Sequence, residues 1–220
     1  MSTDGTAAVP ATQVSLDGNQ LAYSISASGC DWQEWKVRDV QTGSDLADEL
    51  KWVKFSGVSW TTDSKGFFYS RYDEPKGDTL KATNYFQKVY FHKLGSRQSD
   101  DVLVYERPDQ KDWLFGGNVT EDGNYLIITV FQGTDVKNRV YYKDLKSDSE
   151  VVKLLDDFDA AYNFVGNDGT RFWFHTDLQS PRGKIVEIDI KNPARNNWKV
   201  IVPETKDALQ SVSLVDNKII

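Results

Sequence analysis

Histidine and cysteine, which often act as a base and as a nucleophile, are few in this 220-residue sequence. Hydrolysis by a serine nucleophile would need an elbow of the form Gly-x-Ser-x-Gly with a histidine and an acid, and the sequence contains no such elbow. Its two histidines, His92 and His175, lie at the ends of expected strands without a clustered carboxylate partner. We therefore expect structural or surface roles for both, no catalytic residue and no metal site.

Carboxylates are plentiful, but pairs that could share acid and base roles are not evident. The densest groups are Asp100-Asp101 and Asp156-Asp157 with Asp159. Adjacent residues of a strand point to opposite faces, so neighbours in the sequence make poor acid–base dyads. We expect these groups to be solvated turns.

A different set of aspartates recurs at regular intervals. Five segments share short apolar alternation, a turn that contains an aspartate, and an apolar or aromatic run. The turn aspartates are Asp17, Asp63, Asp122, Asp168 and Asp216, separated by 46, 59, 46 and 48 residues. Asp-Gly and Asp-Asn readily adopt the positive φ of tight turns, so each segment predicts a hairpin. Recurrence favours a backbone-turn role for these aspartates over five separate active sites.

Further strands follow each predicted hairpin. Third strands are expected at 34–40, 88–94, 139–145 and 184–190, and fourth strands at 102–106, 151–155 and 198–202. Four strands in every 40–50 residues or so, rich in β-branched and aromatic residues and without helical periodicity, are typical of propeller blades rather than of a helical solenoid. The expected fold is all-β, a partial β-propeller of four-stranded antiparallel blades.

The repeat divides the chain, 1–220, into about four complete blades and part of a fifth. The expected blades are 8–54, 55–110, 111–159 and 160–206, with the start of the next at 207–220. Because the sequence stops inside a hairpin, we expect a piece of a larger ring whose open strand edges self-associate. The second blade is longer because of a polar insertion at 73–87, which we expect to be a surface loop with a function.

Composition restricts the partners and the environment. With 33 acidic and 26 basic side chains the net charge is −7, which disfavours nucleic acid and anionic membrane surfaces as partners. No apolar stretch approaches the ~20 residues that span a bilayer, and the lone Cys30 can form no intrachain disulfide. No signal peptide is evident, so we expect a cytoplasmic protein, or a periplasmic one if a missing N-terminal region carries a signal. No cofactor is expected.

Several strings of residues resemble the prolyl oligopeptidase family in their order along the chain. They are SASGCDW at 26–32, VKFSGVSW at 53–60, QKVYFHKLG at 87–95, GGNVTEDG at 116–123, NRVYYKDL at 138–145 and WKVIVPE at 198–204. The resemblance implies a seven-bladed propeller that covers an α/β-hydrolase domain. That domain carries a Ser, Asp and His triad and cleaves after proline in short peptides. Because the chain has no position that matches the triad, we expect the hydrolase domain to be absent and the chain alone to be inactive.

The resemblance also implies which residues face the hydrolase domain. Asp31 matches an acid near a substrate-binding arginine of that domain, and Phe55 matches an aromatic residue at an outer specificity pocket. The segment 73–87, with Asp73, Lys76, Thr83 and Gln87, matches a mobile interface loop that gates access. A turn-capping role for Asp31 and a core role for Phe55 stay open. The implied partners are the hydrolase domain and short proline-containing peptides.

Two other functions stay open. A free-standing propeller could serve as a scaffold for protein interactions, which predicts a closed ring. A propeller hydrolase such as a glycosidase would need two carboxylates that converge at about 5–10 Å.

Overall fold

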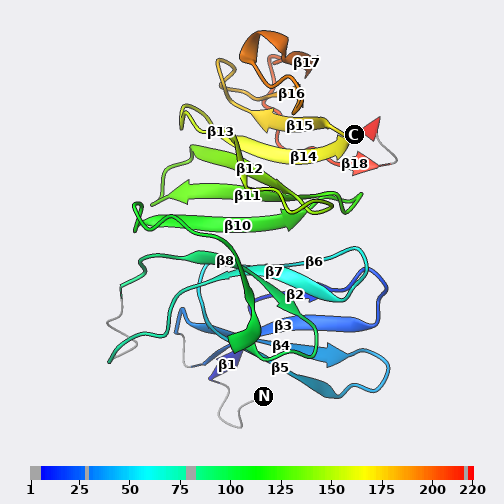
Figure 1. The fold of residues 1–220 in the computed structure, drawn as a ribbon. Coiled ribbons are helices and arrows are strands. Elements are labelled where there is room, and N and C mark those ends of the chain that lie inside the picture. Colours follow the sequence, from blue (N-terminus) through cyan, green and yellow to red (C-terminus); the bar gives the residue numbers. More distant parts are fainter. Residues whose placement is uncertain (1–5, 28–29, 78–82, 216–217) are drawn as a thin grey trace. The chain divides into compact units, whose positions relative to one another are not determined.

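The computed structural model describes residues 6–27, 30–77, 83–215 and 218–220 (Figure 1). In these residues the regular structure is almost entirely antiparallel strands, with two short 3-10 helices, η2 (Gln98–Asp100) and η3 (Arg195–Asn197). This confirms the expected fold class, an all-β chain built from four-stranded antiparallel propeller blades. Within the described ranges no helix is long and apolar enough to cross a membrane.

The chain consists of two compact units, residues 1–119 and 120–220. The boundary lies inside the expected blade 111–159, so the blade limits inferred from the repeat stay predictions. Asp216 of the fifth turn, residues 28–29 and residues 78–82 of the insertion lie outside the described residues.

The first unit contains two sheets. The first sheet comprises β1 (Ala7–Ala8), β2 (Thr12–Val14), β3 (Gln20–Ala27), β4 (Gln33–Asp39) and β5 (Asp45–Val53). It has one strand more than a regular blade because the entering chain lies along β3 in two pieces, β1 and β2. The second sheet has the order β6 (Val58–Trp60), β7 (Gly66–Arg71), β8 (Lys88–Lys93) and β9 (Val102–Tyr105). The last strand of the unit is β10 (Trp113–Val119).

The second unit continues the same pattern. It contains β11 (Tyr125–Gln132), β12 (Asn138–Asp144) and β13 (Val152–Leu155), which pair consecutively. A complete sheet follows in the order β14 (Tyr162–Asp168), β15 (Arg171–Thr176), β16 (Lys184–Asp189) and β17 (Lys199–Val202). A final hairpin pairs β18 (Leu214–Val215) with β19 (Lys218–Ile219). The expected third and fourth strands are found, each with its ends shifted by at most one residue.

The recurring turn aspartates close the hairpins as the repeat predicts. In three of them a hydroxyl two residues earlier donates to the carboxylate, which also accepts the backbone N–H two residues later. The hydroxyl–carboxylate pairs are Ser15–Asp17, Thr61–Asp63 and Thr120–Asp122, at 2.6, 2.7 and 2.6 Å. Asp168 differs: Gly166 replaces the hydroxyl residue, and the carboxylate pairs with Arg171 instead.

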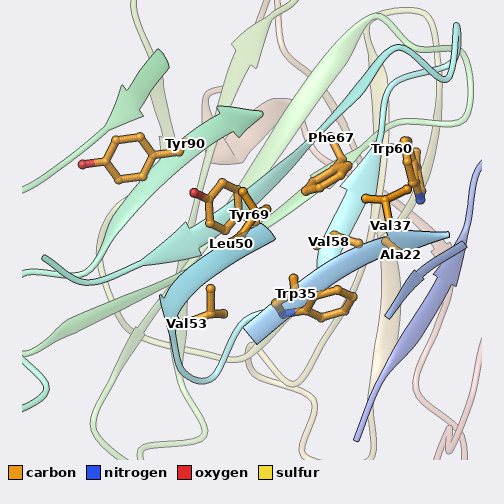
Figure 2. Packing of buried hydrophobic residues seen from close by; sticks show 10 residues of the cluster. All are labelled: Ala22, Trp35, Val37, Leu50, Val53, Val58, Trp60, Phe67, Tyr69 and Tyr90. Atoms are coloured by element: carbon orange, nitrogen blue, oxygen red, sulfur yellow. The ribbon is translucent and has the colours of Figure 1, made fainter. Parts of the chain in front are cut away.

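Alternating strand residues build a separate core in each unit. In the first unit, side chains of β3, β4 and β5 pack with those of β6, β7 and β8 (Figure 2). This cluster comprises Ala22, Trp35, Val37, Leu50, Val53, Val58, Trp60, Phe67, Tyr69 and Tyr90. In the second unit the cluster comprises Ile127, Val140, Leu155, Ala160, Tyr162, Phe172, Phe174, Val186 and Ile188. Val53 and Val58 anchor both ends of the 54–57 linker in the first core.

A buried histidine in the first unit corrects two expectations. His92 on β8 lies between two carboxylates: its Nδ1 is 2.7 Å from Asp101 Oδ1 and its Nε2 is 2.9 Å from Asp48 Oδ1. The Tyr69 hydroxyl donates to the other oxygen of Asp101 at 2.7 Å. The expectations that His92 lacks carboxylate partners and that Asp101 lies in a solvated turn are therefore wrong. Asp48 is 44 residues from His92 in the sequence, so local spacing could not indicate the pair.

Candidate functional site

Topology places three of the expected site segments at one end of the first unit. The β3–β4 connection carries Asp31, the β5–β6 linker carries Phe55, and the β7–β8 connection contains the insertion 73–87. The ends of β3 and β5 meet the start of β4 in the register of the first sheet. The Tyr72 N–H donates to the Trp52 carbonyl at 3.0 Å, which joins the end of β7 to the end of β5.

A cavity of about 490 Å³ opens at this end. Its lining comprises Trp32, Tyr72, Asp73, Glu74, Pro75, Lys76, Thr83, Tyr85 and Phe86. The fold thus brings three of the four expected loop residues, Asp73, Lys76 and Thr83, around one space together with the neighbour of Asp31. Aromatic walls with a few polar groups at the rim are typical of a site for a peptide or a small molecule.

Gln87 has a different position from the other loop residues. Its side chain is only 1% exposed and donates through Nε2 to the Lys54 carbonyl at 2.9 Å. Its Oε1 accepts the Phe115 N–H at 2.6 Å. Gln87 therefore fixes the end of the insertion to the linker and to β10, and it does not line the cavity.

Asp31 and Phe55 are both on the surface. Asp31 is exposed, and no described residue is hydrogen-bonded to its carboxylate. Phe55 is 57% exposed, so it is not a core residue. An exposed phenylalanine and an exposed carboxylate at the same end of a unit can contact a partner with an apolar surface and a cation.

The backbone at this end is unusual. Trp52, Phe55 and Phe86 have φ of 62°, 55° and 61°, in the left-handed region that bulky side chains rarely adopt. Such residues tend to cluster at ligand-binding and switch positions, where the surrounding structure holds them. Here the Trp52 carbonyl accepts the Tyr72 N–H, and the Phe86 N–H donates to the Lys111 carbonyl at 2.8 Å.

Lys54 contacts the wall residue Trp32 and is almost fully buried, with 7% of its surface exposed. Its Nζ lies 4.0 Å from the centre of the Trp32 ring and donates to Asn84 Oδ1 at 3.1 Å. No carboxylate in the described part of the chain forms an ion pair with it. The Trp32 ring also meets Trp52 and Tyr72 edge to face, at 5.9 Å from each.

The ionisable groups of the cavity are not arranged for acid–base catalysis. Burial raises the pKa of Tyr72 to about 12, so its hydroxyl stays neutral at ordinary pH. Asp73 is paired with Lys88 at 2.8 Å. Burial by itself lowers the pKa of Lys88, but the hydrogen bond to Asp73 together with the charges of Asp73, Tyr90 and Glu106 outweighs it, so the pKa of Lys88 is raised. Within the described ranges no group of three or more metal-ligating side chains converges.

Five cavity or support residues were not singled out from the sequence: Trp52, Lys54, Tyr72, Tyr85 and Phe86. The Tyr85-Phe86 pair carried a usable signal, because two adjacent aromatic residues in a polar insertion are unusual. Lys54 carried none, since a lysine at the end of a strand is normally solvated.

The four-stranded antiparallel sheets define a propeller module, and a cavity lined by loop residues lies at one end of its first unit. The model of a family described as "Prolyl oligopeptidase, N-terminal beta-propeller domain" matches residues 1–220. The chain belongs to this family, as the resemblance of its sequence strings predicts.

Relatives and solved structures agree with this assignment. Prolyl oligopeptidase A of Amanita bisporigera is 38% identical over 99% of the chain, and the prolyl endopeptidase of Elizabethkingia meningoseptica is 37% identical over 95%. A structure from an analysis of two prolyl endopeptidases superposes with a TM-score of 0.88 at 36% identity over 98% of the chain. Prolyl oligopeptidase B from Galerina marginata, bound to a 35mer substrate, has a TM-score of 0.88 at 30% identity over 98%. The matches cover 31%, 30%, 31% and 32% of those proteins, so the chain spans about three tenths of their length.

Proposed function

We propose that this chain is the substrate-selecting propeller portion of a serine endopeptidase that cleaves after proline in short peptides. The observation that carries the proposal is the aromatic cavity beside Asp31, bordered by the insertion 73–87 at the end where Phe55 is exposed. Family membership supports it, and so do relatives named prolyl endopeptidase. A relative solved with a 35mer hydrolysis and macrocyclization substrate adds that peptides are ligands in this family.

Each surface residue then has a role toward an α/β-hydrolase domain. The Asp31 carboxylate, which has no partner among the described residues, accepts hydrogen bonds from an arginine that holds the substrate carbonyl. Phe55 offers apolar area to a peptide side chain. The insertion, through Asp73, Lys76 and Thr83, controls entry to the space beside them.

The chain alone is expected to be inactive. A serine peptidase needs a histidine that can accept a proton from the nucleophile. Both ring nitrogens of His92 are already bound to carboxylates and the residue is fully buried, so it cannot do so. In the proposal, the catalytic groups come from the hydrolase domain.

The test mixes the chain with the separately expressed hydrolase domain of the Elizabethkingia meningoseptica prolyl endopeptidase. Two reporters carry the same cleavable proline, one in a short peptide and one in a folded protein of about 100 residues. We expect no cleavage by the chain alone, cleavage of both reporters by the hydrolase domain, and selective loss of cleavage of the folded reporter when the chain is added. Asp31→Asn should weaken this effect.

Two results would contradict the proposal. Cleavage by the chain alone would show that it carries catalytic groups. If a saturating concentration of the chain leaves the relative cleavage of the short and the folded reporter unchanged, the alternative, a scaffold for protein interactions, is favoured. Intrinsic fluorescence and circular dichroism of the Asp31→Asn variant control for loss of folding.

A further inference from the structure

Lys54 contacts two separate segments that border the cavity. Trp32, which lies over its ammonium group, is one wall of the cavity. Asn84, which accepts its hydrogen bond, stands between Thr83 and Tyr85 of the opposite wall. One side chain therefore joins the β3–β4 connection to the returning end of the insertion.

The main chain of Lys54 strengthens the same connection. Its carbonyl accepts the Gln87 amide, three residues beyond Asn84, at 2.9 Å. The next residue, Phe55, is held in the left-handed region with its ring exposed. Lys54 thus contacts, or adjoins, all three segments in which the site residues lie.

The environment of the ammonium group is costly for stability. A buried cation normally has a carboxylate partner, because an aromatic ring and one amide oxygen replace only part of its hydration. In the described part of the chain Lys54 has only the ring and the amide. A methionine here would fill similar volume without the desolvation cost, so global stability does not explain a lysine at this position.

We propose that Lys54 is a positioning residue that sets the separation between the Trp32 wall and the 83–86 wall of the cavity. Its cation–π contact and its bond to Asn84 hold the insertion against the β3–β4 connection. When that hold is lost, residues 83–86 move away from Trp32 and the cavity widens. The inference rests on the proposed function in one respect only, that the cavity admits peptides.

The first measurement uses the 220-residue chain alone. Native-state cleavage by trypsin at the exposed Lys76–Gly77 bond, followed by mass spectrometry, reports opening of the insertion, because proteolysis tracks the population of the open form. We expect Lys54→Met to raise this rate about tenfold, which corresponds to ~1.4 kcal/mol. The urea midpoint of the whole chain should stay unchanged or rise.

Four further variants make the comparison specific. Lys54→Arg keeps the cation and should cleave within about twofold of the parent rate. Lys51→Met changes an exposed lysine of the preceding strand, β5, which pairs with Glu49, and should have no effect. Trp32→Leu is compared in two backgrounds, the parent chain and Lys54→Met. If Lys54 acts through Trp32, Trp32→Leu should raise the trypsin cleavage rate less in Lys54→Met than in the parent chain.

Two outcomes overturn the inference. An unchanged cleavage rate in Lys54→Met shows that the lysine does not hold the insertion. If Lys54→Met is cleaved faster and the free energy of unfolding of the whole chain falls by the equivalent amount, Lys54 is an ordinary structural residue.

The second measurement repeats the length-selection assay with Lys54→Met and the hydrolase domain. We expect cleavage of the folded reporter to return while kcat for the short peptide stays within about twofold. If trypsin reports opening but the parent chain gives no length selection, the proposed function fails and the positioning role stands. If the parent chain selects by length and Lys54→Met selects equally well, the positioning role fails and the proposed function stands.

Discussion

The buried His92 predicts an unusual dependence of stability on alkaline pH. Burial by itself lowers the pKa of His92, but the hydrogen bonds to Asp101 and Asp48 outweigh it and raise the pKa to about 9, from an ordinary value of 6.5. The side chain is fully buried, so solvent does not screen these bonds. The imidazole is therefore a cation at neutral pH and holds two carboxylates together.

The direction in which stability changes with pH follows from the higher pKa of His92 in the folded state. The contribution of His92 is fully present below pH 6.5 and is lost as the pH rises from 6.5 through 9. At about 1.4 kcal/mol per pH unit, the difference between 6.5 and 9 corresponds to about 3 kcal/mol. Removing the cation while both acids stay buried should cost a similar amount, about 3–5 kcal/mol.

The assay is urea unfolding at pH 6 and at pH 9.5, followed by fluorescence and circular dichroism. We expect the parent chain to lose about 3 kcal/mol between these pH values through His92, and His92→Leu to lack this loss. Comparison with the variant cancels the titration of other groups. The matched control is His175→Gln, which changes a partly exposed histidine of the second unit. Should His92→Leu not fold, His92→Gln, which keeps one donor, allows the same comparison.

Two results would refute this reasoning. One is an NMR titration that gives His92 a pKa near 6.5. The other is a parent chain and a His92→Leu variant that lose stability equally between pH 6 and pH 9.5. Either would mean that the buried cluster does not carry a cation in solution.

Three further substitutions should change the urea midpoint by different mechanisms. Gly66→Ala would place a Cβ too close to the His92 carbonyl oxygen, so we expect the free energy of unfolding to fall by about 1–3 kcal/mol. Gly57→Ala, where the space is open, should change it little. Gln87→Leu would leave the Phe115 N–H and the Lys54 carbonyl without their partner, so the free energy of unfolding should fall by about 2–4 kcal/mol. An unchanged urea midpoint would show that other groups replace the amide. Asp63→Ala removes two turn bonds at an exposed position and should cost only about 1 kcal/mol, and a loss as large as that of Gln87→Leu would contradict the turn role.

The sheets could be predicted from the sequence because their causes are local. A turn such as Thr61 to Lys65 contains both the hydroxyl and the N–H that bind Asp63, so five consecutive residues suffice to specify it. Alternation along a strand such as Gln33–Asp39 likewise indicates which side chains enter the core. The lengths and turns of the repeat therefore indicated a propeller before any pairing was known.

The site could be predicted only in part. The strings around Asp31, Phe55 and the insertion pointed to the segments that lie at one end of the first unit. They did not indicate that Gln87 is buried, since its partners, Phe115 and Lys54, are 28 and 33 residues away. Nor did they indicate the left-handed backbone of Trp52 and Phe86, which packing imposes against local preference.

The sequence by itself determined the fold class, the hairpin turns and the family, because these depend on residues close together or on strings in order. The tertiary structure alone decided the ionic state of His92, the burial of Asp101 and the position of Lys54 beneath Trp32. Each of these depends on partners from separate strands or loops, such as Asp48, 44 residues from His92. Burial strengthens electrostatic contacts between such residues, and only the paired sheets bring those side chains out of water and within reach of one another.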